Sequence, residues 1–354
     1  ESRDGNGNVS PVVGATAVAL TVSSGTGAFY SDSARTAAIT GMTLGAGASA
    51  IGFYFKDTAV GVRTLTASAG GLSPATQTAT VTTAGSATRL AFTTTAQNIV
   101  AGACSGAATV QSQDSFGNPV NVAAATPVAL SSSAATGTFF SDPGCTVAAS
   151  TLSIGAGGNA ATFYFKDTRA GTPTLTGAAA GLSNATQVET VRAGAPLGLA
   201  FVTPPQTLAA GACSAAITVR VRDGFGNTAT VAAATAVGLT GNSTGGAYYS
   251  DAACTALVLS AAIGAGSSTT TVYYRDTRAG SVTLTAASAG LATATQVETI
   301  TPGLSTQLAF VTAPQTVAAG GCSALTSVGS ESSATSSSSM GRCYCGWCVR
   351  WRSG

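Results

Sequence analysis

The chain has 354 residues, of which 45% are hydrophobic and only 8% are charged, and it contains no His. Removing four residues of the C-terminal tail (Glu331, Arg342, Arg350 and Arg352) leaves twelve basic and twelve acidic residues. A neutral chain of this kind lacks the basic surface that attracts nucleic acid or anionic membranes. No apolar run approaches the roughly 18 residues of a membrane helix, so no direct membrane insertion is expected.

Three stretches of the sequence are near-copies of one another. FYSD at 29–32 and FYFKDT at 53–58 return as FFSD and FYFKDT, and then as YYSD and VYYRDT, with spacings of 110 and 109 residues. A period of this size indicates a tandem array of one small domain rather than a short solenoid unit. Such an array supplies length and surface.

Short linkers ending at Gly85, Gly194 and Gly303 divide the array, and each precedes a strand that reads RLAF, GLAF or QLAF. Linkers this short favour a semi-rigid rod. The predicted segments are a first copy that lacks its opening strands (1–84), a complete second copy (85–193), a complete third copy (194–302), the start of a further copy (303–328) and an aberrant tail (329–354).

The second copy shows the predicted elements in order. RLAF (89–92) and ATVQSQD (108–114) alternate with period two, and the FGN turn (116–118) follows. Further short runs, each bounded by Gly, Pro, Ser or Asn, bring the total to seven or eight strands per copy. This pattern predicts an all-β fold of tandem immunoglobulin-like Greek-key sandwiches, with a closed barrel as the alternative.

The cysteines of the two complete copies share one spacing. Cys104 precedes Cys145 by 41 residues, and Cys213 precedes Cys254 by the same 41. We predict one disulfide per copy, which implies an oxidising compartment. Buried free thiols are the alternative, while a zinc site is disfavoured because the chain has no His. The first copy carries Arg35 at the second cysteine position.

The tail breaks the pattern after Val328. It ends in a C-x-C-x-x-C cluster beside two tryptophans, which could bind a metal or exchange disulfides. The Gly-Asn pair expected at 335–336 is replaced by Thr and Ser. A frameshift restores Gly-Asn one position earlier, so we predict that the tail has left the reading frame.

Nine of the thirteen acidic residues occupy three positions repeated in every copy. The first opens a D-x-x-G-N turn, the second ends an aromatic strand, and the third follows Lys or Arg at a strand end. Turn formation explains these positions. The alternative is calcium bound at junctions between copies, and its candidate ligands in the complete copies are Asp114, Asp142, Asp167, Asp223, Asp251 and Asp276.

Catalysis finds no support in the sequence. The absence of His removes the commonest general base, and the acids recur in every copy as scaffold residues do. We therefore predict no catalytic residues, no cofactor and no enzymatic activity. The aromatic strands place Tyr54, Tyr164 and Tyr273 opposite their core neighbours, so a repeated exposed tyrosine hints at a glycan or protein contact.

The D-x-F-G-N turn and the later AG-x-x-TLT segments (170–176 and 279–285) resemble the bacterial immunoglobulin-like repeats of invasin and intimin type. The resemblance implies an extracellular or cell-surface location, with an outer-membrane-associated full-length parent. The first hypothesis is a structural and adhesive stalk for an unknown protein or glycan ligand. The alternatives are accessory, carbohydrate-binding modules of a secreted polysaccharide-active enzyme and calcium-binding spacer domains.

Overall fold

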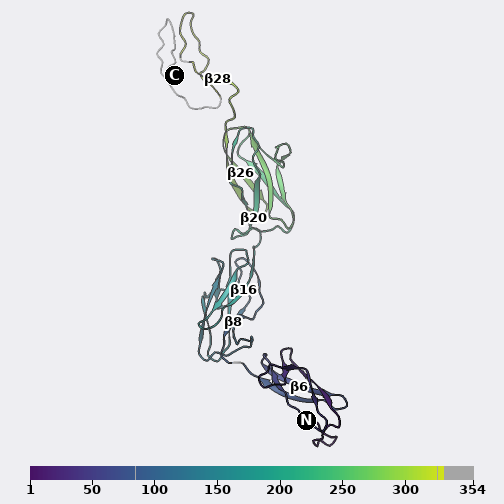
Figure 1. Ribbon diagram of the computed structural model, residues 1–354. Coiled ribbons are helices and arrows are strands. Elements are labelled where there is room, and N and C mark those ends of the chain that lie inside the picture. Colours follow the sequence, from purple (N-terminus) through teal and green to yellow (C-terminus); the bar gives the residue numbers. More distant parts are fainter. Residues whose placement is uncertain (84, 325, 331–354) are drawn as a thin grey trace, which may run out of the picture. The chain divides into compact units, whose positions relative to one another are not determined.

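The computed structural model describes residues 1–83, 85–324 and 326–330, and this part of the chain consists of strands, turns and loops (Figure 1). The chain divides into two compact units, Glu1–Ala193 and Gly194–Gly354. A search of the described residues finds no helix long and apolar enough to cross a membrane. Most of the predicted aberrant tail lies outside the described residues.

The second copy is a two-layer sandwich. One sheet has the order β12-β14-β10-β8, the other has the order β13-β11-β15-β16, and β9 pairs in parallel with β17. Its strands are β8 (Arg89–Phe92), β9 (Asn98–Val100), β10 (Ala108–Gln113), β11 (Thr126–Ser132), β12 (Thr138–Phe140), β13 (Thr151–Ile154), β14 (Ala160–Lys166), β15 (Thr174–Ala178), β16 (Ala185–Val188) and β17 (Thr190–Arg192).

This order confirms the predicted immunoglobulin-like Greek key. In chain order, β8, β10, β12 and β14 correspond to strands A, B, D and E of one sheet, while β11, β15 and β16 correspond to C, F and G of the other. The additional strand β13 pairs with β11, although it follows β12 in the chain. The copy has more strands than predicted, because the loop after RLAF contributes β9 and the last run is divided at Glu189.

The third copy repeats this arrangement, and its two sheets are joined by a single parallel bridge between Gly198 and Ala292. Its strands are β18 (Gly198–Phe201), β19 (Thr207–Ala209), β20 (Ile217–Arg222), β21 (Thr235–Gly241), β22 (Gly246–Tyr249), β23 (Leu257–Val258), β24 (Ser260–Ile263), β25 (Thr269–Asp276), β26 (Gly280–Ser288) and β27 (Leu291–Thr301).

The first copy forms a four-stranded sheet, β4-β1-β6-β7, and a three-stranded sheet, β3-β2-β5. Its strands are β1 (Thr16–Val22), β2 (Ala28–Tyr30), β3 (Ala38–Ile39), β4 (Gly41–Leu44), β5 (Tyr54–Lys56), β6 (Gly61–Ala69) and β7 (Ala75–Val81). Beyond the third copy, β28 (Leu308–Phe310) pairs with β29 (Val328–Ser330). No strand among residues 1–83 corresponds to β8.

The core of each sandwich follows from alternation along the strands. In the second copy, Val110, Val128 and Ile154 are fully buried between the sheets, while their neighbours along the strands face outward. Phe139 packs against Phe163 and Phe165, with ring centroids 5.7 and 5.3 Å apart. Aromatic packing of this kind lets a chain rich in small residues fill a core.

Candidate functional sites

The acids that open the D-x-x-G-N turns are occupied by the turns themselves. Asp114 is buried, and its Oδ1 accepts hydrogen bonds from the backbone N–H groups of Phe116 and Asn118, both at 2.9 Å. Its Oδ2 accepts a third bond from the Asn118 side chain at 2.9 Å. Asp223 repeats this pattern with Phe225 and Asn227. The carboxylates therefore fix the turns, as an Asx turn does.

The second set of acids holds the loop that carries a cysteine. Asp142 accepts bonds from the backbone N–H groups of Thr146 at 3.0 Å and Val147 at 2.6 Å. The bond from Val147 is the main reason that the pKa of Asp142 lies below its ordinary value. Asp251 is held in the same way, with Ala256 N–H at 2.6 Å as the main cause of its lowered pKa.

The third set of acids is buried, and its two complete-copy members differ. Asp167 Oδ1 accepts bonds from the Thr136 hydroxyl at 2.5 Å and from Arg169 N–H at 2.9 Å. Asp167 Oδ2 is buried and has no hydrogen-bond partner among the described residues. Asp276 Oδ1 accepts a bond from Arg278 N–H, and its Oδ2 accepts one from the Tyr274 hydroxyl at 2.8 Å.

The six calcium candidates thus lie in separate places. Within residues 1–83, 85–324 and 326–330, no group of three or more His, Cys, Asp or Glu side chains is close enough to hold a metal ion. The oxygens that calcium would use accept N–H and O–H bonds instead, apart from Asp167 Oδ2. These six carboxylates stabilise the loops and turns that carry them.

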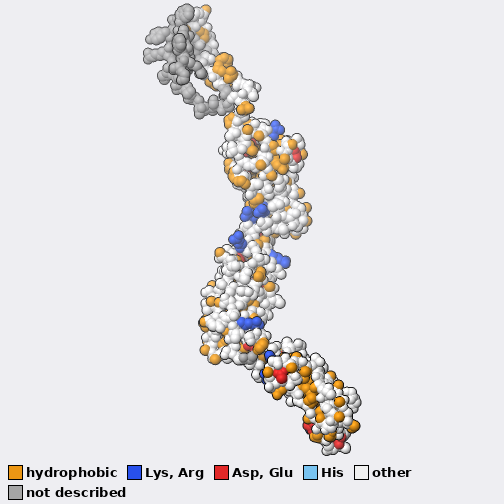
Figure 2. Space-filling model, in the orientation of Figure 1, with side chains coloured by type: hydrophobic (Ala, Val, Ile, Leu, Met, Phe, Trp, Pro, Cys, Tyr) orange, Lys and Arg blue, Asp and Glu red, His pale blue; other side chains and the backbone are white. Residues whose placement is uncertain are grey.

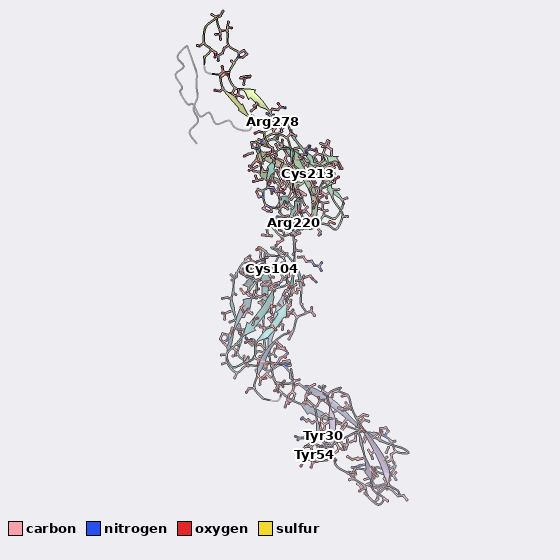
Figure 3. The ribbon with its side chains drawn as sticks, turned by 45° about the horizontal axis from the view of Figure 1, so that its top comes forward. Tyr30, Tyr54, Cys104, Cys213, Arg220 and Arg278 are labelled. Atoms are coloured by element: carbon pink, nitrogen blue, oxygen red, sulfur yellow. A yellow bond between two sulfur atoms is a disulfide. The ribbon has the colours of Figure 1, made fainter. Side chains whose placement is uncertain are left out.

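Each predicted cysteine pair is joined in the structure. Cys104 lies at the edge of β14 through a bridge to Lys166, and its sulfur is 1.98 Å from that of Cys145. The Cys213–Cys254 pair is built alike, with 1.99 Å between the sulfurs and 5.8 Å between the Cα atoms. Each disulfide links the segment before β10 or β20 to the loop held by Asp142 or Asp251. Figure 3 labels Cys104 and Cys213.

Two buried glutamates form polar contacts that the sequence does not predict. Glu189 is 2% exposed and accepts a hydrogen bond from the backbone N–H of Gln97. Glu298 accepts the equivalent bond from Gln206 N–H and a second from the Gln296 side chain at 2.6 Å. The signal that could have found them is the constant separation of 92 residues between each glutamine and its glutamate.

An outward-facing aromatic pair recurs on one sheet of every copy. Tyr30 and Tyr54 are cross-strand partners in the first copy, and Tyr54 is 44% exposed (Figure 3). The same place holds Phe140 with Tyr164 and Tyr249 with Tyr273. Lys56 follows Tyr54 by two residues and so lies on the same face. The exposed Tyr54 ring, the half-buried Tyr30 ring and the Lys56 cation make this face of the first copy a candidate contact for a sugar or a peptide.

Few charges accompany these surfaces. On the face drawn in Figure 2, Lys, Arg, Asp and Glu atoms form small separate groups among uncharged side chains.

The Asn118 side chain joins the first two copies within Glu1–Ala193. Its Nδ2 donates a hydrogen bond to the carbonyl of Thr58 at 2.8 Å, and its Oδ1 accepts one from Val60 N–H at 2.9 Å. The turn fixed by Asp114 therefore also touches the preceding copy.

No protein-family model and no curated protein matches the chain. Among solved structures, domains 4 and 5 of the S-layer protein SbsC match 38% of this chain and 67% of theirs, with 20% identity and a TM-score of 0.23. The adhesin InvE of Yersinia pseudotuberculosis matches 60% of this chain and 58% of its own, with 20% identity and a TM-score of 0.25. A β-glycosidase from Bacteroides vulgatus matches 56% of this chain and 23% of its own, with 13% identity and a TM-score of 0.26.

Proposed function

We propose that the chain is a non-enzymatic structural and adhesive stalk region of a large secreted or cell-surface bacterial protein. The observation that carries this proposal is the use of the repeated acids. The carboxylate oxygens of these acids accept hydrogen bonds from N–H groups of their own loops, as Asp114 and Asp142 do. A residue set that recurs in every copy and stabilises that copy is typical of a spacer domain.

The disulfides support the same proposal. Each one links two segments that lie 41 residues apart in the chain, so it limits how far a copy can extend when its sheets separate. A bond of this kind also persists best outside the reducing cytoplasm. Pulling on single molecules tests the stalk role, because a stalk must resist extension and a ligand-binding module need not.

The adhesive part of the proposal rests on the outward aromatic pair. An exposed tyrosine beside a lysine offers a flat apolar ring and a cation to a sugar or a peptide. This face equally favours the second candidate, an accessory carbohydrate-binding module of a polysaccharide-active enzyme. A glycan array probed with the intact chain and with Tyr54→Ala tests whether this face binds a polysaccharide. Saturable binding to one polysaccharide class that is lost in the variant favours the module.

The calcium-spacer candidate has less support, because most of its candidate oxygens already accept protein hydrogen bonds. Asp167 Oδ2 is the exception, being buried without a partner among the described residues. Thermal unfolding of the chain with calcium and with a chelator tests this candidate. Superimposable curves would remove calcium from the account, while a higher melting temperature with calcium that Asp167→Asn abolishes would establish it.

A further inference from the structure

The outward face of one sheet in the third copy carries a strip of basic, hydroxyl and aromatic side chains. Along β20, Arg220 and Arg222 alternate with buried valines, so both arginines point away from the core. Both side chains are half-buried, because they lie partly along the sheet and partly in solvent. Figure 3 labels Arg220 on this copy. The two guanidinium groups form one basic end of the strip.

The pairing of β20 with β25 continues the strip along the second strand. Thr218 lies opposite Thr271, and their hydroxyl oxygens are 3.5 Å apart. Beyond this pair, Tyr273 and the exposed Arg275 face outward from β25, and Tyr249 lies beside Tyr273 as its cross-strand partner. About four steps of two residues separate the two ends of the strip, so it is about 27 Å long at roughly 6.7 Å per step.

The two arginines of β20 lack anionic partners. No ion pair among the described residues involves Arg220 or Arg222, and their Nε atoms are buried without a hydrogen-bond partner there. Arg222 donates one hydrogen bond, from Nη1 to the Gly226 carbonyl at 2.9 Å, while the neighbouring Asp223 is buried and fixes a turn. Donors that have lost water without gaining an acceptor raise the free energy of the folded state. An anion bound to the accessible nitrogens offsets this cost, because each guanidinium group shares one delocalised charge.

The second copy shows that the fold does not need arginine at these positions. The counterparts of Arg220 and Arg222, 109 residues earlier, are glutamines. Gln113 Nε2 donates a hydrogen bond to Gln111 Oε1 at 3.0 Å, so these two side chains are partners of each other. The strand that carries them, β10, pairs with β8 and β14 as β20 pairs with β18 and β25. The charge of the arginines is therefore not used to build the sheet.

We propose that this strip of the third copy binds an acidic polysaccharide, whose chain lies along the strands. The inference rests on the adhesive face of the proposed function and names the class of its ligand. Arg220 and Arg222 donate paired N–H bonds to a carboxylate or sulfate group of the polymer. The threonine hydroxyls bond to sugar hydroxyls, and the ring of Tyr273 packs on the apolar face of a sugar. The length of the strip accommodates several consecutive sugar units.

The balance of charge favours a polysaccharide over other anionic polymers. Apart from the tail, the chain has twelve basic and twelve acidic residues, so it lacks the long-range field that concentrates nucleic acid or anionic membranes. Nucleic acid also carries a phosphate at every unit, whereas the middle of the strip offers only hydroxyls and aromatic rings. A polymer whose charges are separated by neutral, hydroxyl-bearing groups matches this order of side chains.

Calorimetric titration of the full chain with polygalacturonate, dextran sulfate and neutral dextran tests the proposal. We expect saturable binding to at least one acidic polymer, weaker binding at higher salt, and no binding to dextran. Binding to polygalacturonate alone assigns the anion as a carboxylate, and binding to dextran sulfate alone assigns it as a sulfate. Arg220→Gln with Arg222→Gln should weaken the binding by about tenfold or more, because charge-assisted bonds are lost. Thermal unfolding should not change, since the second copy folds with glutamines at these positions.

Arg192→Gln with Arg278→Gln is the matched control, because it removes the same charge from exposed positions outside the strip. An equal loss of affinity in this control, or binding that survives the glutamines at 220 and 222, would overturn the proposal. Failure of both acidic polymers to bind, or tighter binding of single-stranded DNA than of either, would overturn it as well. The proposed function fails separately, since resistance to force and any binding of neutral glycans that Tyr54→Ala abolishes do not depend on these arginines.

Discussion

The Tyr274 hydroxyl donates a hydrogen bond to Asp276 Oδ2 at 2.8 Å, and the second copy has no equivalent bond among its described residues. There Phe165 replaces the tyrosine, and Asp167 Oδ2 is left buried without a partner. Gly246 makes room for the hydroxyl, since a side chain at that position would collide with it. The buried carboxylate therefore has a hydrogen-bond donor for its Oδ2 in the third copy and none in the described part of the second copy.

This difference predicts opposite effects for reciprocal substitutions. Tyr274→Phe should destabilise the third copy by about 1 kcal/mol, because it removes a donor from a buried carboxylate. Phe165→Tyr should stabilise the second copy by a similar amount, because it supplies the missing donor. Denaturant unfolding of the chain measures both. Equal destabilisation by the two substitutions would show that the ring packing, and not the hydroxyl, controls these sites.

The buried carboxylate of Glu189 predicts a dependence of stability on pH. Burial raises the pKa of Glu189, and the bond from Gln97 N–H only partly opposes this. The folded state therefore holds the proton more tightly than the unfolded state, so this contribution is complete below the unfolded pKa and is lost as the pH rises through the folded pKa. Melting temperatures of wild type and Glu189→Gln between pH 4 and pH 8 check this, with the range set by the ordinary value of about 4.3.

The wild-type melting temperature should fall relative to that of Glu189→Gln as the pH rises through this range. The glutamine keeps an oxygen acceptor for Gln97 N–H but does not titrate. Parallel profiles for the two proteins would contradict the assignment of this pH dependence to Glu189.

Asn118 predicts a local effect at the contact between the first two copies. Asn118→Ala removes the acceptor of the Val60 amide proton, so hydrogen exchange at Val60 should accelerate. Asn8→Ala is the matched control, because Asn8 makes the same turn contacts to Asp4 in the first copy. Unchanged protection of Val60 in Asn118→Ala would mean that this bond does not persist in solution.

The loop that carries the second cysteine predicts a stabilising change in the first copy. Arg35, Cys145 and Cys254 all have positive φ, at 55°, 51° and 53°. Because Arg35 has this conformation without a disulfide, the turn held by Asp32 sets the backbone. Arg35→Gly should therefore stabilise the first copy by up to about 1 kcal/mol. Ala34→Gly should not, and a loss of stability in Arg35→Gly would contradict this explanation.

Alternation and turn signals were sufficient to predict the sandwich fold, because they are local. The Asp114 turn forms as predicted, since its bonds join residues two and four positions apart. Alternation alone does not predict the last strand, where Val188 is 52% exposed and Glu189 is buried. A sequence pattern that assigns valine to the core and glutamate to solvent cannot detect a backbone N–H group 92 residues away that needs an acceptor.

The contact of Asn118 with Thr58 and Val60 could not be predicted either, because it depends on the placement of one turn against the preceding copy. The same holds for the calcium candidates. Their recurrence was visible in the sequence, but the partners of Asp142 and Asp167 are fixed by loop geometry. Recurrence and turn chemistry therefore identified these positions and their role in turns, but not the individual partners of each carboxylate.

The stalk role is tested most directly by pulling single molecules by their ends, with and without reductant. If the second copy is a mechanical spacer with a Cys104–Cys145 bond, its unfolding under oxidising conditions hides the 41 residues that the bond encloses. Reduction should then lengthen the extension by about 140 Å, at roughly 3.4 Å per residue. Cys104→Ser with Cys145→Ser should give the long extension without reductant. Sandwiches that extend without a force peak, or an extension unaffected by reduction, would contradict the proposed disulfide-bonded stalk.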